Sequence, residues 1–246
     1  MRKFGLIGYP LSHSFSQKYF TEKFQQLGIT DCRYELYPIG DIAGLSAILQ
    51  DPELCGLNVT IPYKQAVIPF LHGMNAIVEE IRACNCIRIE DGRLYGYNTD
   101  TVGFEESLVR KLRPDHRHAL ILGTGGASKA VEFVLRKLGI EFMYVSRNVG
   151  HGVLRYEEVD QDILGRHTLV INTTPLGMYP RVEECPPLPY EAIGSQHYLF
   201  DLVYNPARTL FLRQGEERGA VVENGYDMLI GQAEESWRIW NSQASA

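Results

Sequence analysis

Short β-prone runs alternate with helical runs along most of this chain, and this alternation restricts the possible folds more than any other feature. A strand, a helix and a second strand in succession favour parallel pairing, because the helix carries the chain back to the starting edge of the sheet. A parallel sheet needs helices on both of its faces. We therefore expect an α/β protein, and 246 residues suffice for one large domain or two small ones.

Apolar spacing locates the individual elements. The patterns predict strands over residues 3–8, 32–39, 54–59, 118–122, 142–145, 168–172 and 198–203, with a hairpin over 85–97. They predict helices over 19–27, 42–49, 64–71, 75–82, 100–112, 127–138, 207–218 and 227–240. The segment 113–118 is polar and rich in turn residues, so we place a domain boundary there, and we expect His116 and His118 within it to be solvated.

Composition excludes several functional classes. The net charge is -6 and there is no basic block, which argues against a nucleic-acid partner. The longest apolar runs fall far short of the roughly 20 residues that span a bilayer, so no membrane partner is expected. Five cysteines and a start without a signal-peptide pattern favour a cytoplasmic protein without disulfides. Cys84 and Cys86 have no second pair to complete a zinc site, so no metal is expected.

A glycine-rich loop, Gly123-Thr124-Gly125-Gly126-Ala127-Ser128, lies between a predicted strand and a predicted helix. Glycines in this context let the backbone approach a pyrophosphate, which the helix N-terminus attracts. No carboxylate for a ribose 2′-hydroxyl follows the next strand. Instead Arg147 is available for a 2′-phosphate, which favours NADP over NAD. The alternative is that Arg147 is a solvated surface arginine.

Four segments rich in small polar residues follow predicted strands, where ligands of open α/β sheets bind. They are Ser12-His13-Ser14-Phe15-Ser16, Asn58-Val59-Thr60-Ile61-Pro62-Tyr63-Lys64, Ala83-Cys84-Asn85-Cys86 and Tyr97-Asn98-Thr99-Asp100. Each also has an ordinary interpretation, since Ser14, Ser16, Asn98 or Asp100 can cap a helix and Asn85 can belong to a turn. A shared polyhydroxylated ligand would explain all four segments.

The ordered set of motifs resembles the shikimate dehydrogenase family over almost the whole chain. Besides these segments and the glycine loop, it includes Asn172-Thr173-Thr174-Pro175-x-Gly177-Met178, Asp201-x-x-Tyr204-x-Pro206 and Met228-Leu229-Ile230-x-Gln232. The resemblance implies an N-terminal α/β substrate domain, a Rossmann-type parallel-sheet dinucleotide domain and a cleft between them. The expected boundaries are 1–113 for the substrate domain, 114–225 for the dinucleotide domain, and 226–246 for a C-terminal helix that returns to the first domain.

The resemblance also implies the activity and the residues that carry it. The activity is the NADP-linked, reversible reduction of 3-dehydroshikimate to shikimate in aromatic biosynthesis, with Lys64 and Asp100 as the catalytic pair. The residues expected to bind substrate are Ser14, Ser16, Asn58, Thr60, Asn85, Tyr204 and Gln232, together with Asp100. The nucleotide would contact Gly123, Thr124, Gly125, Gly126, Ala127, Ser128, Ser146, Arg147, Asn148, Asn172, Thr173, Thr174, Met178, Leu202 and Gly225.

Two alternatives to this function stay open. One is a dehydrogenase that acts on quinate or shikimate with NAD, because a pocket difference of one hydrogen bond can separate these substrates. The other is a non-catalytic sensor that binds NADP, although the presence of both Lys64 and Asp100 argues against it. The family usually has Asn-Arg-Thr where this chain has Ser146-Arg147-Asn148, and the following segment is short. The contacts on the adenine side are therefore open, as is the choice between a monomer and a homodimer.

Overall fold

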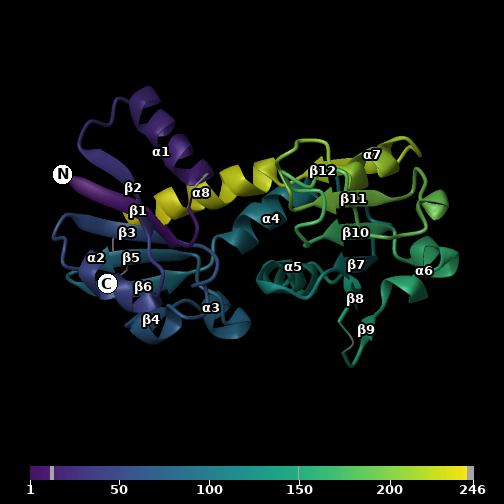
Figure 1. Cartoon of the computed structure of the whole chain (residues 1–246), viewed down its shortest axis with the longest axis horizontal. Coiled ribbons are helices and arrows are strands. Elements are labelled where there is room, and N and C mark those ends of the chain that lie inside the picture. The colour runs from purple at the N-terminus through teal and green to yellow at the C-terminus, as the bar shows by residue number, and fades with distance from the viewer. Residues whose placement is uncertain (12–13, 149, 243–246) are drawn as a thin grey trace. The chain divides into compact units, whose positions relative to one another are not determined.

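The computed structural model describes residues 1–11, 14–148 and 150–242, and it divides the chain into two compact units (Figure 1). Unit 1 comprises Met1–Thr99 and the C-terminal segment from Ala233, whereas unit 2 comprises Asp100–Gln232. The expected α/β fold class is confirmed: the N-terminal unit is an α/β unit, and the other unit has a Rossmann-type sheet. No helix among the described residues is long and apolar enough to cross a membrane.

Unit 1 is built on one mixed sheet with the strand order β2-β1-β3-β5-β6-β4. Its strands are β1 (Arg2–Gly8), β2 (Cys32–Pro38), β3 (Leu54–Val59), β4 (Gly73–Met74), β5 (Cys86–Glu90) and β6 (Arg93–Tyr97). β1 pairs in parallel with β2 and β3, and β5 is antiparallel to β3 and β6. The helices are α1 (Phe15–Gln26), α2 (Leu45–Ile48), α3 (Ala76–Ile81) and the end of α8 (Tyr226–Asn241), with short 3₁₀ turns η1 (Ile42–Gly44) and η2 (Ile68–Phe70).

Aromatic side chains join α1 and α8 to one face of this sheet, while α2 and α3 cover the other face (Figure 1). The ring of Trp240 stacks on Phe4 with ring centroids 4.7 Å apart. Its indole N–H donates to the carbonyl oxygen of Ile87 at 3.0 Å. A Cβ at Gly56 would lie 2.3 Å from the Trp240 Nε1, so only glycine allows the indole this close to β3.

Unit 2 is a parallel sheet with the order β12-β11-β10-β7-β8-β9. Its strands are β7 (His118–Leu122), β8 (Glu141–Val145), β9 (Val153–Leu154), β10 (Leu169–Asn172), β11 (Tyr198–Asp201) and β12 (Val221–Asn224). The helices α4 (Asp100–Val109) and α5 (Gly126–Lys137) cover one face, and α6 (Gln161–Arg166) and α7 (Leu210–Glu216) cover the other (Figure 1). This is the strand order of a Rossmann sheet, with its topological switch between β7 and β10.

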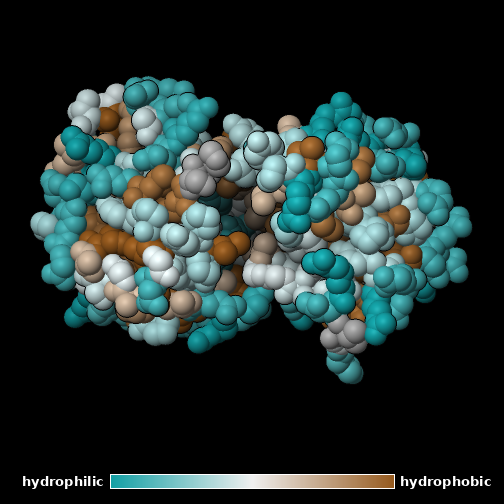
Figure 2. Space-filling view, viewed as in Figure 1, coloured by the Kyte–Doolittle hydropathy of each residue, from teal (hydrophilic) through white to brown (hydrophobic). Residues whose placement is uncertain are grey.

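The described units have mostly hydrophilic side chains on the face shown in Figure 2, with apolar side chains in separate smaller patches. Buried apolar side chains form two clusters on the two faces of each sheet. This distribution is the one expected when helices cover both faces of a sheet.

Three expectations about local structure were wrong. Residues 64–71 form turns and the short η2 in place of a helix, because Pro69 lacks a backbone N–H and restricts the residue before it. The helix expected from 207 begins at Leu210, where the hydroxyl of Thr209 accepts the Leu212 N–H and caps the helix. His116 is buried, and its Nδ1 accepts the N–H of Arg113 at 3.0 Å. The short elements β4, β9, β12 and α6 were not predicted.

The two compact units meet between Thr99 and Asp100 and between Gln232 and Ala233, whereas the expected domain boundaries follow residues 113 and 225. The backbone of α4 lies against the first turns of α8, so both belong to unit 2. A Cβ at Gly103 would lie 2.3 Å from the carbonyl oxygen of Met228. Because α4 packs this closely against the start of α8, it belongs to unit 2, and the division falls before α4 and not at the polar segment 113–118.

Candidate functional site

The glycine loop of unit 2 connects β7 to α5 and meets the end of β10. Gly123 has a φ of 100°, and a Cβ there would lie 2.9 Å from the Thr174 Cγ2. Both the left-handed backbone and the close approach require glycine. Gly125 caps α5 without a side-chain hydrogen bond, and the space around Gly125 and Gly126 is open. The backbone here fits a phosphate group at a helix N-terminus.

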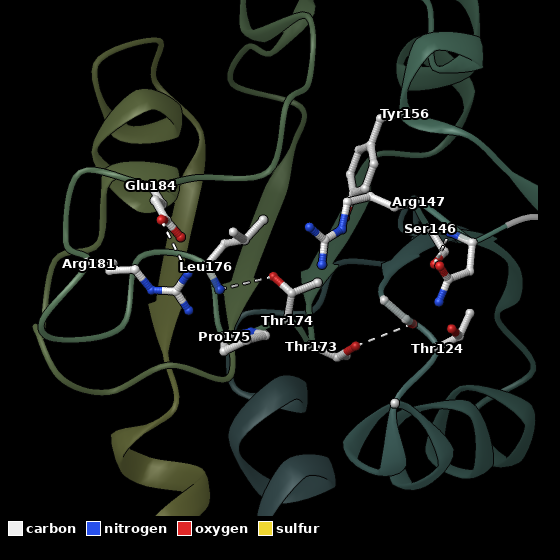
Figure 3. Close-up of a pocket in the computed structure, with 13 residues that line it drawn as sticks. Thr124, Ser146, Arg147, Tyr156, Thr173, Thr174, Pro175, Leu176, Arg181 and Glu184 are labelled. Carbon is white, nitrogen blue, oxygen red and sulfur yellow. Dashed lines mark hydrogen bonds and ion pairs between the residues drawn. The ribbon is translucent and has the colours of Figure 1, made fainter.

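This loop forms part of a pocket of about 550 Å³ in unit 2 (Figure 3). The lining combines the glycine loop, the end of β8 and the segment after β10. The full lining is Gly123, Thr124, Gly125, Ser146, Arg147, Asn148, Tyr156, Thr173, Thr174, Pro175, Leu176, Arg181 and Glu184. The pocket therefore lies at the carboxyl ends of β7 and β10, where Rossmann sheets bind ligands.

A buried carboxylate supports the wall of this pocket. The Oδ1 of Asp201 accepts hydrogen bonds from the Asn172 side-chain amide (2.9 Å) and the Val203 N–H (3.0 Å), and its Oδ2 accepts from the Thr209 hydroxyl (2.6 Å). The Oδ1 of Asn172 in turn accepts the N–H and hydroxyl of Thr174. Burial raises the pKa of Asp201 to about 6, although the hydrogen bonds hold that rise back.

The other residues predicted in unit 2 lie outside the lining of this pocket. Gly126, Ala127 and Ser128 form the first turn of α5, and the Ser128 hydroxyl donates to the carbonyl oxygen of Gly125 at 2.7 Å. A Cβ at Gly225 would lie 2.2 Å from the carbonyl oxygen of Leu202, so these two predicted residues are in close contact. Met178 is about half exposed.

The three residues predicted for substrate or catalysis in unit 2 come from separate elements. Asp100 is the first residue of α4, and Tyr204 lies in the loop after β11, where burial raises the pKa of its hydroxyl. Gln232 is buried in α8, and its amide N–H donates to the carbonyl oxygen of Leu229 at 3.0 Å.

In unit 1, a buried hydrogen-bond network joins two of the predicted substrate residues. The Oδ1 of Asn58 accepts the hydroxyl of Tyr34 at 2.8 Å, and its Nδ2 donates to the Ser236 hydroxyl at 2.9 Å and to the carbonyl oxygen of Asn85 at 3.3 Å. Asn85 bonds Thr99 through both ends of its amide, accepting the Thr99 N–H at 2.6 Å and donating to the Thr99 hydroxyl at 3.0 Å. These partners fix the orientation of both amides.

The remaining residues predicted in unit 1 lie at the start of α1 and in the turn after β3. Ser14 caps α1 by accepting the Gln17 N–H, and Ser16 follows in the first turn. Burial raises the pKa of Tyr34, and a hydrogen bond with Ser16 offsets part of that rise. Ser12 and His13 of the same motif lie outside the described residues.

Thr60 and Lys64 follow the end of β3. The carbonyl oxygen of Thr60 accepts the Tyr63 N–H, and that of Lys64 accepts the Cys84 N–H at 2.8 Å. The turn after β3 is thereby tied to the segment that leads into Asn85 and β5.

Sequence reasoning missed several residues of both clusters. In unit 1 these include Tyr34 and Ser236, which are 24 and 178 residues from their partner Asn58. In unit 2 they include Tyr156, Arg181 and Glu184. The motif Asn172–Met178 ends three residues before Arg181, and that proximity was the only available signal for it.

The fold and the pocket define an α/β protein with a Rossmann-type nucleotide-binding unit and a second, mixed-sheet unit. A family model described as the shikimate dehydrogenase substrate binding domain matches residues 6–87. A relative from Clostridium beijerinckii named shikimate dehydrogenase (NADP(+)) is 38% identical over 259 residues, covering 98% of this chain and 92% of the relative. The chain belongs to the shikimate dehydrogenase family, as its motifs predicted.

Other relatives agree with this assignment. A protein of the same name from Caldicellulosiruptor bescii is 34% identical over 259 residues, covering 98% of this chain and 89% of the relative. The crystal structure of shikimate 5-dehydrogenase from Thermus thermophilus in complex with NADP(H) and shikimate has a TM-score of 0.86 and 30% identity. That match covers 98% of this chain and 94% of the crystallised one.

Proposed function

We propose that this chain catalyses the reversible, NADP-dependent reduction of 3-dehydroshikimate to shikimate, a step toward chorismate and the aromatic amino acids. The main support is that motif residues gather into two built clusters, a nucleotide pocket with Arg147 in unit 2 and an oriented pair of amides in unit 1. The names of the relatives support the same reaction.

The nucleotide pocket has the chemistry that NADP needs. Gly123 allows close approach of a pyrophosphate, and the uncapped start of α5 attracts its negative charge. Arg147 supplies a cation for the 2′-phosphate, with the Ser146 hydroxyl and the Asn148 amide beside it in the lining. When bound, NADPH supplies the hydride for the carbonyl carbon.

On the substrate side, we assign Ser14 and Ser16 to the carboxylate and Asn58, Thr60, Asn85, Tyr204 and Gln232 to the ring and its hydroxyls. Reduction converts the ketone to an alcohol, so negative charge develops on the carbonyl oxygen and one proton must be added there. The Lys64 ammonium stabilises this oxygen and donates the proton, and the Asp100 carboxylate orients the ammonium. In the oxidation of shikimate, neutral Lys64 accepts the hydroxyl proton.

The proposal includes the expected surroundings of the enzyme. All five cysteines are free thiols, which suits the cytoplasm as the compartment. We expect a small-molecule substrate, no nucleic-acid partner, and a monomer or homodimer.

An absorbance assay of reduced nicotinamide at about 340 nm tests the proposal directly. Purified protein should oxidise shikimate with NADP⁺, and Lys64→Ala should lower kcat by roughly 10²- to 10⁴-fold while nucleotide binding persists. Lys18→Ala, which removes an exposed lysine of α1, is the matched control and should keep full activity. Full turnover by Lys64→Ala would remove that residue from the mechanism.

The same assay separates the two other functions. Faster oxidation of quinate than of shikimate, with NAD⁺ preferred, would identify the quinate-type enzyme. Binding of NADP without turnover of either acid would identify the sensor.

A further inference from the structure

The helix α8 contributes a buried hydroxyl to the hydrogen-bond network of unit 1. Ser236 is fully buried, and its hydroxyl accepts an N–H of the Asn58 side-chain amide at 2.9 Å. The same hydroxyl shares a hydrogen bond of 3.3 Å with the hydroxyl of Thr99. Asn58 lies on β3 and Thr99 follows β6, so Ser236 connects the last helix to two separate segments of the chain.

Packing alone does not explain a serine at this position. Residues three and four positions away lie on the same face of a helix. For Ser236 these include Ala233, Ile239 and Trp240, which are buried in an apolar cluster of unit 1. A buried hydroxyl costs free energy unless it is hydrogen-bonded, so alanine would fit such a face at a lower cost. The two hydrogen bonds of the hydroxyl are therefore what serine adds here.

The bond to Ser236 completes the donor end of the Asn58 amide. Its Nδ2 has two N–H groups, one of which donates to Ser236 and the other to the carbonyl oxygen of Asn85 at 3.3 Å. The Oδ1 accepts the hydroxyl of Tyr34 and has a second lone pair. Asn58 therefore meets a ligand as an acceptor, and the position of its oxygen depends on the partners of Nδ2.

On its other side, Ser236 reaches the Asn85 amide through Thr99. The Thr99 hydroxyl accepts an N–H of the Asn85 amide at 3.0 Å, and the Thr99 N–H donates to the Asn85 Oδ1 at 2.6 Å. The hydroxyl of Ser236 thus joins two halves of one chain of hydrogen-bonded side chains. Its members in order are Ser16, Tyr34, Asn58, Ser236, Thr99 and Asn85.

We propose that Ser236 is a positioning residue for the substrate, because it holds the Asn58 amide and the Thr99 hydroxyl in the orientation that the ring hydroxyls of shikimate require. The inference rests on the proposed function, which assigns Asn58 and Asn85 to those hydroxyls. Ser236 acts through these amides and does not itself contact the substrate. Its removal should therefore weaken substrate binding and leave the chemical step in place.

Steady-state kinetics and calorimetric titration with shikimate test the variant Ser236→Ala. Loss of one buried neutral hydrogen bond should raise KM and Kd for shikimate by about three- to tenfold. The kcat and the KM for NADP⁺ should change less than about twofold, because the groups that transfer hydride and proton are untouched. Ser236→Thr keeps the hydroxyl and should restore most of the affinity. An unchanged KM and Kd in Ser236→Ala would overturn the inference.

A double variant tests whether Ser236 acts through Asn58. Tyr34→Phe removes the donor to the Asn58 Oδ1, and Ser236→Ala removes the acceptor of its Nδ2. Residues that act on the same group have non-additive effects. The Kd of the double variant should therefore rise by less than the product of the two single increases. A rise equal to that product would show that Ser236 acts independently of Asn58, which would overturn the inference.

Ile239→Val is the matched control for a purely structural effect. Ile239 is buried on the same helix and in the same apolar cluster, and its side chain has no polar group that could join the network. Loss of one methylene should lower the melting temperature and leave the KM for shikimate as in the wild type. An equal rise of KM in Ile239→Val and Ser236→Ala would assign Ser236 to stability alone and overturn the inference.

The two readouts also separate this inference from the proposed function. A wild type that binds shikimate but does not oxidise it would refute the proposed function, and a weaker Kd in Ser236→Ala would still support the inference. An active wild type whose KM and Kd ignore Ser236 would do the reverse. A wild type that neither binds nor oxidises shikimate would refute both.

Discussion

Replacing Asp201 by asparagine should change how the stability of this protein depends on pH. Asp201 is fully buried at the end of β11, and its carboxyl oxygens accept three hydrogen bonds that join β10, β11 and the start of α7. Burial raises the pKa of Asp201 from 3.8 to about 6. Asparagine has nearly the same shape and no charge, so it keeps the acceptor that faces Asn172 and Val203.

The sign follows from the direction of that pKa change. Between 3.8 and about 6 the folded protein keeps the Asp201 proton while the unfolded chain releases it. The folded state therefore binds more protons in this window, and stability falls as pH rises through it. The rise in pKa corresponds to about 3 kcal/mol in total, of which about 2 kcal/mol is lost between about pH 4 and pH 8.

Urea unfolding of the wild type and Asp201→Asn at both pH values measures this effect. Other titrating groups contribute equally to both proteins, so the difference between the two proteins isolates Asp201. In the wild type the Thr209 hydroxyl donates to the Asp201 carboxylate. In the variant the asparagine amide must donate to that hydroxyl instead, and the free-energy cost of this reversal is the same at every pH. Relative to the wild type, the variant should gain about 2 kcal/mol from pH 4 to pH 8. A constant difference would refute the reasoning.

Two further predictions concern packing and the substrate-side network. Tyr34→Phe leaves the Oδ1 of Asn58 without a buried donor, so we expect a loss of about 1–3 kcal/mol in unfolding free energy and a higher KM for shikimate with kcat nearly unchanged. Tyr63→Phe, which removes a hydrogen bond to a backbone carbonyl oxygen, should lower stability without that change in KM. Gly103→Ala places a methyl group 2.3 Å from the carbonyl oxygen of Met228, so thermal unfolding should show a loss of at least about 2 kcal/mol. An unchanged KM in the first case, or an unchanged melting temperature in the last, would contradict these predictions.

Local sequence patterns were sufficient to predict most of the regular structure. The run His118–Leu122 and the apolar face that includes Val131, Val134 and Leu135 predict a strand followed by a helix, and both are present. The period of these elements reflects burial on a sheet face, which is a local property of the sequence. Short elements such as β4, with two residues, give no period to detect.

Proline and capping chemistry determined where helix predictions failed. The apolar spacing from Lys64 to Leu71 suits a helix, but Pro69 lacks the backbone N–H that the interior of such a helix would use, and it stands instead at the start of the short 3₁₀ turn η2. Thr209 illustrates the same competition, since its hydroxyl is used both to cap α7 and to bind Asp201. These two hydrogen bonds of Thr209 fix the start of α7 at Leu210. The apolar periodicity alone leaves the start of a helix uncertain by a few residues.

The clusters themselves depend on contacts that no local pattern encodes. Ser236 bonds Asn58 across 178 residues, and it can do so only because α8 packs on the sheet of unit 1 through Trp240. That packing requires Gly56, since any Cβ there would occupy the place of the indole. A glycine in β3 therefore decides whether a serine in the last helix can orient an amide two residues from that glycine. Motifs could identify Asn58, but only the packing of α8 explains why its amide is already oriented.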